Sequence, residues 1–244
     1  MRRLSLLFGV FSGLLLASCA CSRLPGKPQL GPEVPRPDSV LNSAVLYAEN
    51  CAGCHGAKGK YGPGMDLSDP VYLAIVDDNT LRTTISNGRP GTAMSAFSRK
   101  QGGMLTDEQI NSIIRGIREH WGNPSALGGV TPPSYADTVT GNPQKGEAVY
   151  MTYCVSCHGH NDKGGPKAGS VSNPSYLSLI SDQGLRTIVI AGRPDFGAPD
   201  WRGNVPGHPM SDQEISDVVA WLSSHRPTQS GESNTANSSF GVMP

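Results

Sequence analysis

The sequence predicts an all-α protein with two similar helical domains in tandem. Two blocks, residues 41–122 and 144–227, repeat each other in order, spacing and residue type. Each block ends in a segment whose apolar residues recur at the i, i+3, i+4, i+7 spacing of an amphipathic helix. Neither block contains the alternating apolar and polar pattern of a half-buried strand.

Three pairs of segments define the repeat. YAENCAGCHG (47–56) matches YMTYCVSCHG (150–159), NTLRTTISNGRP (79–90) matches QGLRTIVIAGRP (183–194), and LTDEQINSIIRGI (105–117) matches MSDQEISDVVAWL (210–222). They predict, in each block, a first helix that runs into a cysteine motif, a shorter middle helix around 79–86 or 183–190, and a last helix.

The last helix of each block begins at a capping box, Thr106 with Gln109 and Ser211 with Glu214. On the first helix, Gly146 of the second block replaces Ser43 of the first. A residue without a side chain at this place predicts a close helix–helix contact.

The N-terminus predicts export. A basic start is followed by an apolar run that is too short to span a bilayer, and residues 1–18 end in small residues before Cys19. This pattern resembles the lipobox of bacterial lipoproteins, which implies a lipid on Cys19 and a protein held on the periplasmic face of a membrane. An ordinary secretory signal is the alternative. No role is predicted for Cys21.

Composition shifts divide the rest of the chain. Residues 19–40 are rich in proline and predict an extended tether, 123–143 form a Pro/Gly/Thr linker, and 228–244 form a polar, disordered tail. The formal net charge is zero, and there is no long run of one sign. This composition gives no basis for nucleic-acid binding.

The chemistry is indicated by Cys51-Ala52-Gly53-Cys54-His55 and by its copy from Cys154 to His158. The C-x-x-C-H pattern is typical of c-type haem attachment, in which both thiols bond the haem and the histidine ligates the iron. A disulfide, a zinc site or a redox dithiol would also use paired cysteines. Two copies in an exported chain favour haem.

With these motifs, the flanking helices and the G-R-P loops, each block resembles a class I-like cytochrome c domain, and the pair resembles a dihaem c-type cytochrome. The resemblance implies two covalently bound haems c, attached at Cys51 and Cys54 and at Cys154 and Cys157. It implies His55 and His158 as iron ligands. It also implies a methionine from the Gly/Pro-rich loop as the sixth ligand, which raises the reduction potential.

In the first block, Met94 of GRPGTAMSAF stands where the family has this methionine, and Met104 is a rival. In the second block, GRPDFGAPDW has Ala198 at that place. Three alternatives remain for the second iron: Met210 as ligand, His208 as ligand, or an open coordination site. We rank them in this order, although Met210 aligns with Leu105 and is also expected in the core.

The resemblance predicts an electron carrier and not an enzyme, with redox proteins as donors and acceptors, working alone or as a subunit of a membrane respiratory complex. Two other functions are considered. One is a haem enzyme or gas-binding protein with an open iron in the second block. The other is the electron-accepting subunit of a periplasmic dehydrogenase. Four arginines recur at matching positions of the two blocks: Arg82, Arg89, Arg186 and Arg193. We expect one of each pair either to bind a haem propionate or to be a solvated surface charge.

Overall fold

The computed structural model describes residues 31, 34–160 and 163–227, which form ten α-helices and three 3-10 helices. Within these residues the only β-structure is two isolated bridges, so the predicted all-α class is confirmed. The predicted signal peptide, Cys19, Cys21, most of the tether and the tail lie outside the described residues. No helix of the described part is long and apolar enough to cross a membrane.

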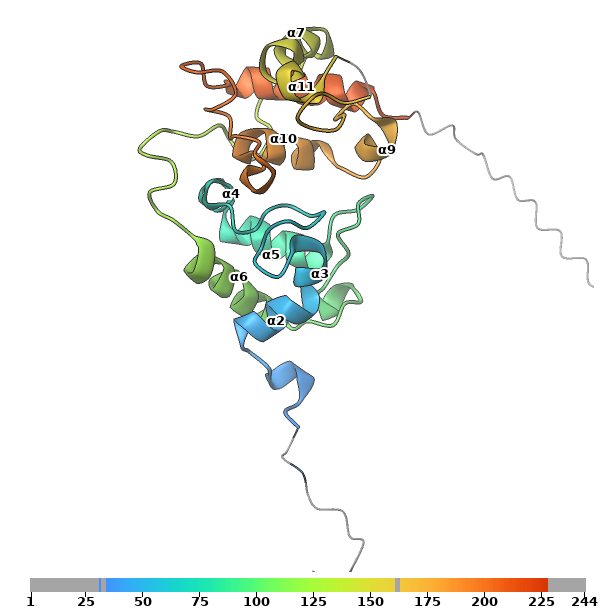
Figure 1. Ribbon diagram of the computed structural model, residues 1–244. Coiled ribbons are helices and arrows are strands. Elements are labelled where there is room, and N and C mark those ends of the chain that lie inside the picture. Colours follow the sequence, from blue (N-terminus) through green and yellow to red (C-terminus); the bar gives the residue numbers. More distant parts are fainter. Residues whose placement is uncertain (1–30, 32–33, 161–162, 228–244) are drawn as a thin grey trace, which may run out of the picture. The chain divides into compact units, whose positions relative to one another are not determined.

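The chain divides into two units. The first ends with the 3-10 helix η2 (Pro37–Ser39), and the second begins at Val40 and contains all other described helices. The first half of this second unit contains α2 (Ser43–Asn50), α3 (Ala52–His55), α4 (Pro70–Ile75), α5 (Asp78–Asn87), η3 (Arg99–Gln101) and α6 (Asp107–Trp121) (Figure 1). Helix α6 packs against both α2 and α5.

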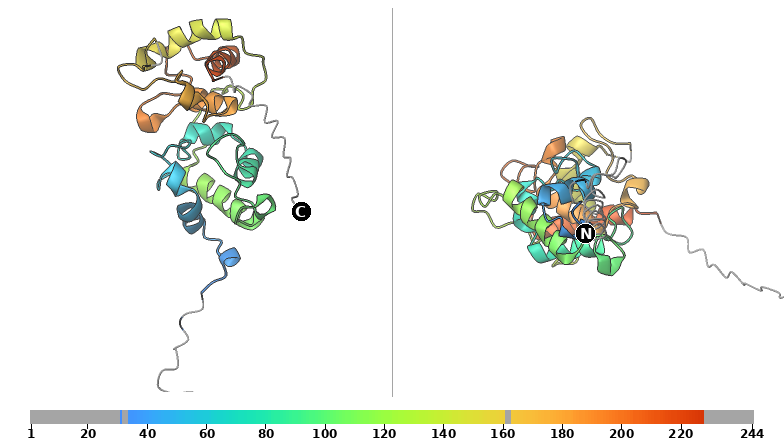
Figure 2. Two further views of the ribbon diagram at one scale, coloured as in Figure 1. Left: turned by 90° about the vertical axis from the view of Figure 1, so that its right-hand side faces the viewer. Right: turned by 90° about the horizontal axis from the view of Figure 1, so that it is seen from below.

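The second half repeats this order. It contains α7 (Pro143–Tyr153), α8 (Val155–His158), α9 (Pro174–Leu177), α10 (Asp182–Ala191), η4 (Pro194–Phe196) and α11 (Asp212–Ser224) (Figure 2). Helix α11 packs against α7 and α10, as α6 packs against α2 and α5. The short helices α4 and α9 were not predicted. Both begin with proline after a capping residue, Asp69 or Asn173, whose side chain accepts hydrogen bonds from the first turn.

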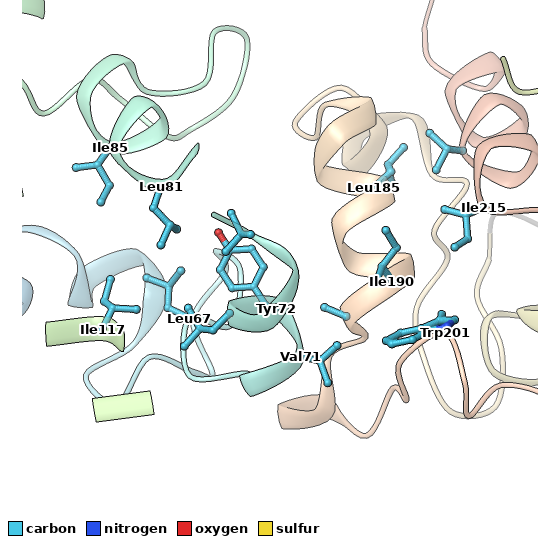
Figure 3. Close-up of a cluster of buried hydrophobic side chains, with 14 of the residues drawn as sticks. Leu67, Val71, Tyr72, Leu81, Ile85, Ile117, Leu185, Ile190, Trp201 and Ile215 are labelled. Atoms are coloured by element: carbon cyan, nitrogen blue, oxygen red, sulfur yellow. The ribbon is translucent and has the colours of Figure 1, made fainter. Parts of the chain in front are cut away.

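Both predicted capping boxes are present. The hydroxyls of Thr106 and Ser211 accept from the backbone N–H groups of Gln109 and Glu214, whose side chains accept in return. The four apolar residues of each last helix are buried: Ile110, Ile113, Ile114 and Ile117, then Ile215, Val218, Val219 and Leu222. Figure 3 shows Leu81 and Ile85 of α5 and Ile117 of α6 in this core, with Leu185 and Ile190 of α10 beside Ile215.

The predicted close helix contact is confirmed. A Cβ atom at Gly146 on α7 would lie 2.0 Å from the carbonyl oxygen of Asp217 and 2.5 Å from Cβ of Trp221, both on α11. In the first block the glycine is on the opposite helix. There, a Cβ at Gly116 on α6 would lie 2.5 Å from Cβ of Ser43 on α2. The two blocks therefore reach the same close crossing with the small residue on different helices.

Part of the predicted linker is docked on the second block. The side chain of Arg186 on α10 is 2% exposed. It donates to the carbonyl oxygen of Ser134 at 3.0 Å, to the hydroxyl of Ser216 at 3.0 Å and to the carboxylate of Asp212. Arg186 is thus neither a solvated charge nor a free partner for a haem propionate, because its donors bind the linker and α11.

Candidate haem sites

Each cysteine motif forms one helical turn. The N–H groups of Cys54 and His55 both donate to the carbonyl of Cys51, at 3.2 and 2.9 Å, and the second motif repeats these bonds at 3.1 and 3.0 Å. Cysteines three positions apart on such a turn lie on one side of it. All four motif cysteines are free, so the structure contains no disulfide between them.

The first thiol of each motif lies in surroundings that favour the protonated form. Burial raises the pKa of Cys51 to about 11 and that of Cys154 to about 12, and the second cysteine of each motif adds to the effect. A zinc site or a redox dithiol needs a thiolate, which such surroundings disfavour. In the described part of the chain, no cluster of three or more histidine, cysteine or acidic residues could hold a metal ion.

The motif histidines each have one ring nitrogen held by the backbone. Nδ1 of His55 lies 2.7 Å from the carbonyl oxygen of Met65, and Nδ1 of His158 lies 2.7 Å from that of Gly169. A carbonyl only accepts, so each Nδ1 carries the hydrogen and Nε2 is left free to ligate a metal. Burial lowers the pKa of His55 and so favours its neutral, ligating form. Sequence reasoning missed these acceptors, because a backbone carbonyl leaves no residue signature.

A glycine follows each motif for a steric reason. Gly56 and Gly159 have φ angles of 81° and 77°, and a Cβ at Gly56 would lie 1.9 Å from the carbonyl oxygen of Lys60. The hydroxyls of Tyr47 and Tyr150 donate to the carbonyls of these glycines, at 2.9 and 2.7 Å. The first helix of each block thereby fixes the turn that leaves the motif.

The two G-R-P loops are closed by equivalent backbone hydrogen bonds. The N–H of Arg89 donates to the carbonyl of Met94 at 2.8 Å, and the N–H of Arg193 donates to that of Ala198 at 3.0 Å. Met94 and Ala198 therefore occupy equivalent positions, as the repeat predicts. Met94 is half-buried, whereas the rival Met104 is 76% exposed.

Met210 occupies the place of Leu105. The N–H of Met210 donates to the carbonyl of Trp201 at 3.0 Å, and the N–H of Leu105 donates to that of Phe97 at 2.8 Å. Met210 is 3% exposed and Leu105 is 4% exposed. The position of Met210 thus fits core packing without reference to a metal.

His208 is exposed and lies against Tyr153, the residue before Cys154. Its Nδ1 is 2.6 Å from the Tyr153 hydroxyl, which donates its hydrogen to Glu214 at 2.9 Å. Since the hydroxyl has one hydrogen, it accepts from Nδ1 of His208, and Nε2 of His208 remains free. Sequence reasoning did not foresee this network, which joins three separate segments.

Both motifs fit a covalently attached haem. Each offers two neighbouring thiols, an imidazole oriented through Nδ1 with Nε2 free, and a glycine turn held by a buried tyrosine. The features recur at matching positions in both blocks. The requirements of thioether attachment and of histidine ligation are therefore met twice in one chain.

Comparisons with known proteins match the same two regions. The family model for cytochrome c matches residues 143–226, and the model for subunit III of cbb3-type cytochrome c oxidase matches residues 39–115. Subunit CcoP of a cbb3-type cytochrome c oxidase from Azospirillum sp. (strain B510) is 31% identical over 142 residues, which cover 54% of this chain and 43% of the relative. Subunit FixP from Bradyrhizobium diazoefficiens is 26% identical over 171 residues, which cover 66% of this chain and 54% of the relative.

The chain spans about half the length of these curated relatives. Among solved structures, a chain of the reducing HAO-like protein complex of Kuenenia stuttgartiensis is 18% identical, with a TM-score of 0.44, and covers 80% of this chain. That likeness is too weak to carry an argument. The repeated motifs and the two matched models agree, and the chain is a c-type cytochrome with two cytochrome c domains in tandem, each with one covalently bound haem c.

Proposed function

We propose that this cytochrome passes single electrons between redox proteins at the outer face of a bacterial membrane, as a subunit of a respiratory complex of the cbb3 oxidase type. The match of residues 39–115 to subunit III of the cbb3-type oxidase carries this proposal. The names of both curated relatives point to the same kind of complex. They favour electron transfer over a haem enzyme, a gas-binding protein or a dehydrogenase subunit.

A haem iron held by ligands on both sides accepts and releases one electron without a change in its bonds. The residues of this chain supply attachment, orientation and surroundings. Cys51, Cys54 and His55 would hold the first haem, and their counterparts in the second motif would hold the other.

The sixth ligand of each haem iron is also a proposal. Met94 is our candidate in the first domain, since it is half-buried in a loop that the Arg89–Met94 hydrogen bond closes, while Met104 is exposed. In the second domain, Met210 stays our first candidate and His208 its rival, with an open site as the third alternative. A different ligand at the second iron would give the two haems different reduction potentials.

Membrane attachment is proposed through a lipid on Cys19. The sequence before Cys19 supports it, and a lipid chain together with the proline-rich segment 19–40 would hold the haem domains near a membrane enzyme. This arrangement would raise the local concentration of the cytochrome at its partner.

Mixing experiments test the function. The full-length cytochrome is reduced and mixed with oxygenated membranes that contain a cbb3-type oxidase. We expect both haems to be oxidised by one electron each, and much more slowly without membranes. A Cys19→Ala variant should keep both haems but lose membrane association and oxidise more slowly at equal bulk concentration. Equally fast oxidation by oxygen or peroxide without membranes would contradict the proposal and indicate a haem enzyme.

A further inference from the structure

Tyr61 stands at a place where the second domain has Gly164. The register follows from the next residues, since a Cβ at Gly62 or at Gly165 would lie 2.2 Å from the carbonyl oxygen of Cys54 or Cys157, respectively. Gly164 has a φ of 90°, and Tyr61 has a φ of 67°, the only positive φ of a non-glycine residue in the described part of the chain. A bulky residue in this conformation is strained and persists only where its surroundings hold it.

Two contacts of Tyr61 come from the second domain, in addition to the Lys60 ammonium over its ring. The carboxylate of Asp195 accepts a hydrogen bond from the Tyr61 N–H at 3.0 Å. The ring of Phe196 lies 6.3 Å from the Tyr61 ring, edge to face. Asp195 and Phe196 replace Gly91 and Thr92 of the first domain's G-R-P loop. Positions at which each domain departs from its copy thus meet one another in space.

Arg193 completes this contact. Its Nε and one Nη donate to the two oxygens of Asp195, both at 2.9 Å, and the same Nη donates to the carbonyl of Gly62 at 3.2 Å. The Asp195 side chain is 0% exposed and that of Arg193 is 14% exposed. Such a shielded, two-fold pair is stronger than an ion pair in water. We call Arg193, Asp195, Tyr61 and Gly62 the interdomain latch.

The latch joins segments that belong to two different haem sites. Tyr61 and Gly62 lie between His55 and Met65, whose carbonyl orients the His55 ring. Within this segment, the N–H of Gly64 donates to the carbonyl of Cys54 at 2.9 Å. On the other side, Arg193 closes the loop that carries Ala198. A shift of the second domain's loop would therefore act on the segment that holds the first histidine.

We propose that Arg193 and Asp195 are positioning residues that fix the second domain's loop on the first domain's attachment loop, and thereby fix the separation across which one electron passes between the two haems. In this step one ferrous iron becomes ferric and one ferric iron becomes ferrous, with no bond or proton transferred. The proposal rests on the electron-transfer function of the cytochrome.

Latch variants of the full-length, haem-loaded chain test the proposal. Arg193→Gln and Asp195→Ala remove the pair, while Arg226→Gln is the matched control. Arg226 also binds a carboxylate, Asp182, and backbone carbonyls, but only within the second domain. In both latch variants we expect the Tyr61 amide hydrogen to exchange about tenfold faster with solvent, as for the loss of one charge-assisted hydrogen bond. Electron exchange between the haems after flash reduction should also slow, and the control should change neither.

Two outcomes are decisive. An unchanged rate of electron exchange between the haems in the latch variants would overturn the proposal, whether or not the Tyr61 amide hydrogen exchanges faster with solvent. Lack of exchange between the haems in the unmodified chain would contradict the proposed function as well. If Arg193→Gln fails to incorporate haem, Arg193→Lys replaces it. Lysine keeps the charge, but it cannot donate two parallel hydrogen bonds to the two Asp195 oxygens. We therefore expect a rate of electron exchange between those of Asp195→Ala and the unmodified chain.

Discussion

At the scale of single residues, Met94 and Ala198 occupy the same place in two loops closed by the same backbone hydrogen bond. A thioether ligand raises the reduction potential, and alanine offers no ligand at all. Met210 lies on the next part of the chain at the position of Leu105, so leucine is already known to fit that place in this fold. Replacing Met210 by leucine therefore removes the sulfur atom and keeps the packing.

Three leucine variants separate the roles of the methionines. Met94→Leu should lower the reduction potential of one haem, on the order of 0.1 V within the ~0.8 V range that axial ligands span, and should allow carbon monoxide to bind at one haem. Met210→Leu should do the same at the other haem with little loss of stability, since the exchange conserves volume. Absorption spectra of the reduced protein with carbon monoxide provide the measurement.

Met104→Leu is the control, because its side chain is 76% exposed. If Met210→Leu binds no carbon monoxide, Met210 is a core residue, and His208→Ala then distinguishes a histidine ligand from another ligand. Carbon monoxide binding by half the haem of the unmodified protein would show an open site.

At the scale of elements, each block depends on one close crossing between its first and last helices. At Gly146 the obstacle to a side chain is the backbone oxygen of Asp217. A backbone atom cannot move aside by a change of side-chain rotamer, so the helices themselves would have to separate. Widening the crossing would pull α7 away from α11 and move Tyr150, whose hydroxyl holds the turn after the second cysteine motif.

We therefore expect Gly146→Ala to lower the free energy of unfolding of the second domain by roughly 3 kcal/mol or more, in spite of the better helix propensity of alanine. Denaturant unfolding of the purified chain measures the effect. Glu147→Ala, at the next and exposed position of α7, should change the stability by less than about 0.5 kcal/mol. A small loss for Gly146→Ala would mean that the crossing is looser than the structure shows.

These elements were predictable from the sequence because their signals are local. Capping boxes, apolar spacing and the repeated Cys-x-x-Cys-His motif each occupy one short segment. Other contacts join different segments of the chain: the hydrogen bond from His55 to the carbonyl of Met65, the one from Arg186 to the carbonyl of Ser134, and the one from Tyr61 to Asp195. No pattern within one segment indicates them. Comparison of the two repeats does not indicate the contact between Tyr61 and Asp195 either, because it lies where the two copies differ.

At the scale of the whole molecule, acidic residues of both blocks act on one buried carboxylate, that of Asp69. Asp69, at the start of α4, is 2% exposed; its Oδ1 accepts from the N–H of Val71 at 2.8 Å, and its Oδ2 has no partner in the described residues. Burial raises the pKa of Asp69 from 3.8 to about 6, and Asp66 and Asp200 add to the shift. Asp200, from the second block, is paired with Arg202.

The sign of the pH effect follows from this shift. The folded pKa lies above the unfolded one, so the stability contributed by protonated Asp69 is fully present below about pH 4 and is lost as the pH rises through about 6. Asp69→Asn should remove this loss and make the protein more stable at pH 7.5, on the order of 1 kcal/mol, because asparagine also caps helices.

Denaturant unfolding at pH 5 and pH 7.5 checks this expectation. Asp77→Asn is the matched control, since Asp77 caps α5 in the same way but is exposed, and its hydrogen bonds to Thr80 lower its pKa. It should show no gain at pH 7.5. An equal gain in both variants would assign the effect to general charge and not to the buried site.

The exchange of small and large residues at the helix crossings has a consequence for modularity. Helix α2 placed on α11 would bring the side chain of Ser43 against the Asp217 oxygen. Helix α7 placed on α6 would set Gly146 opposite Gly116 and leave an unfilled gap. A chimaera that trades first helices between the blocks should therefore fold poorly, although both helices lead into the same haem-binding motif. The two halves are copies in pattern, but their parts are not interchangeable.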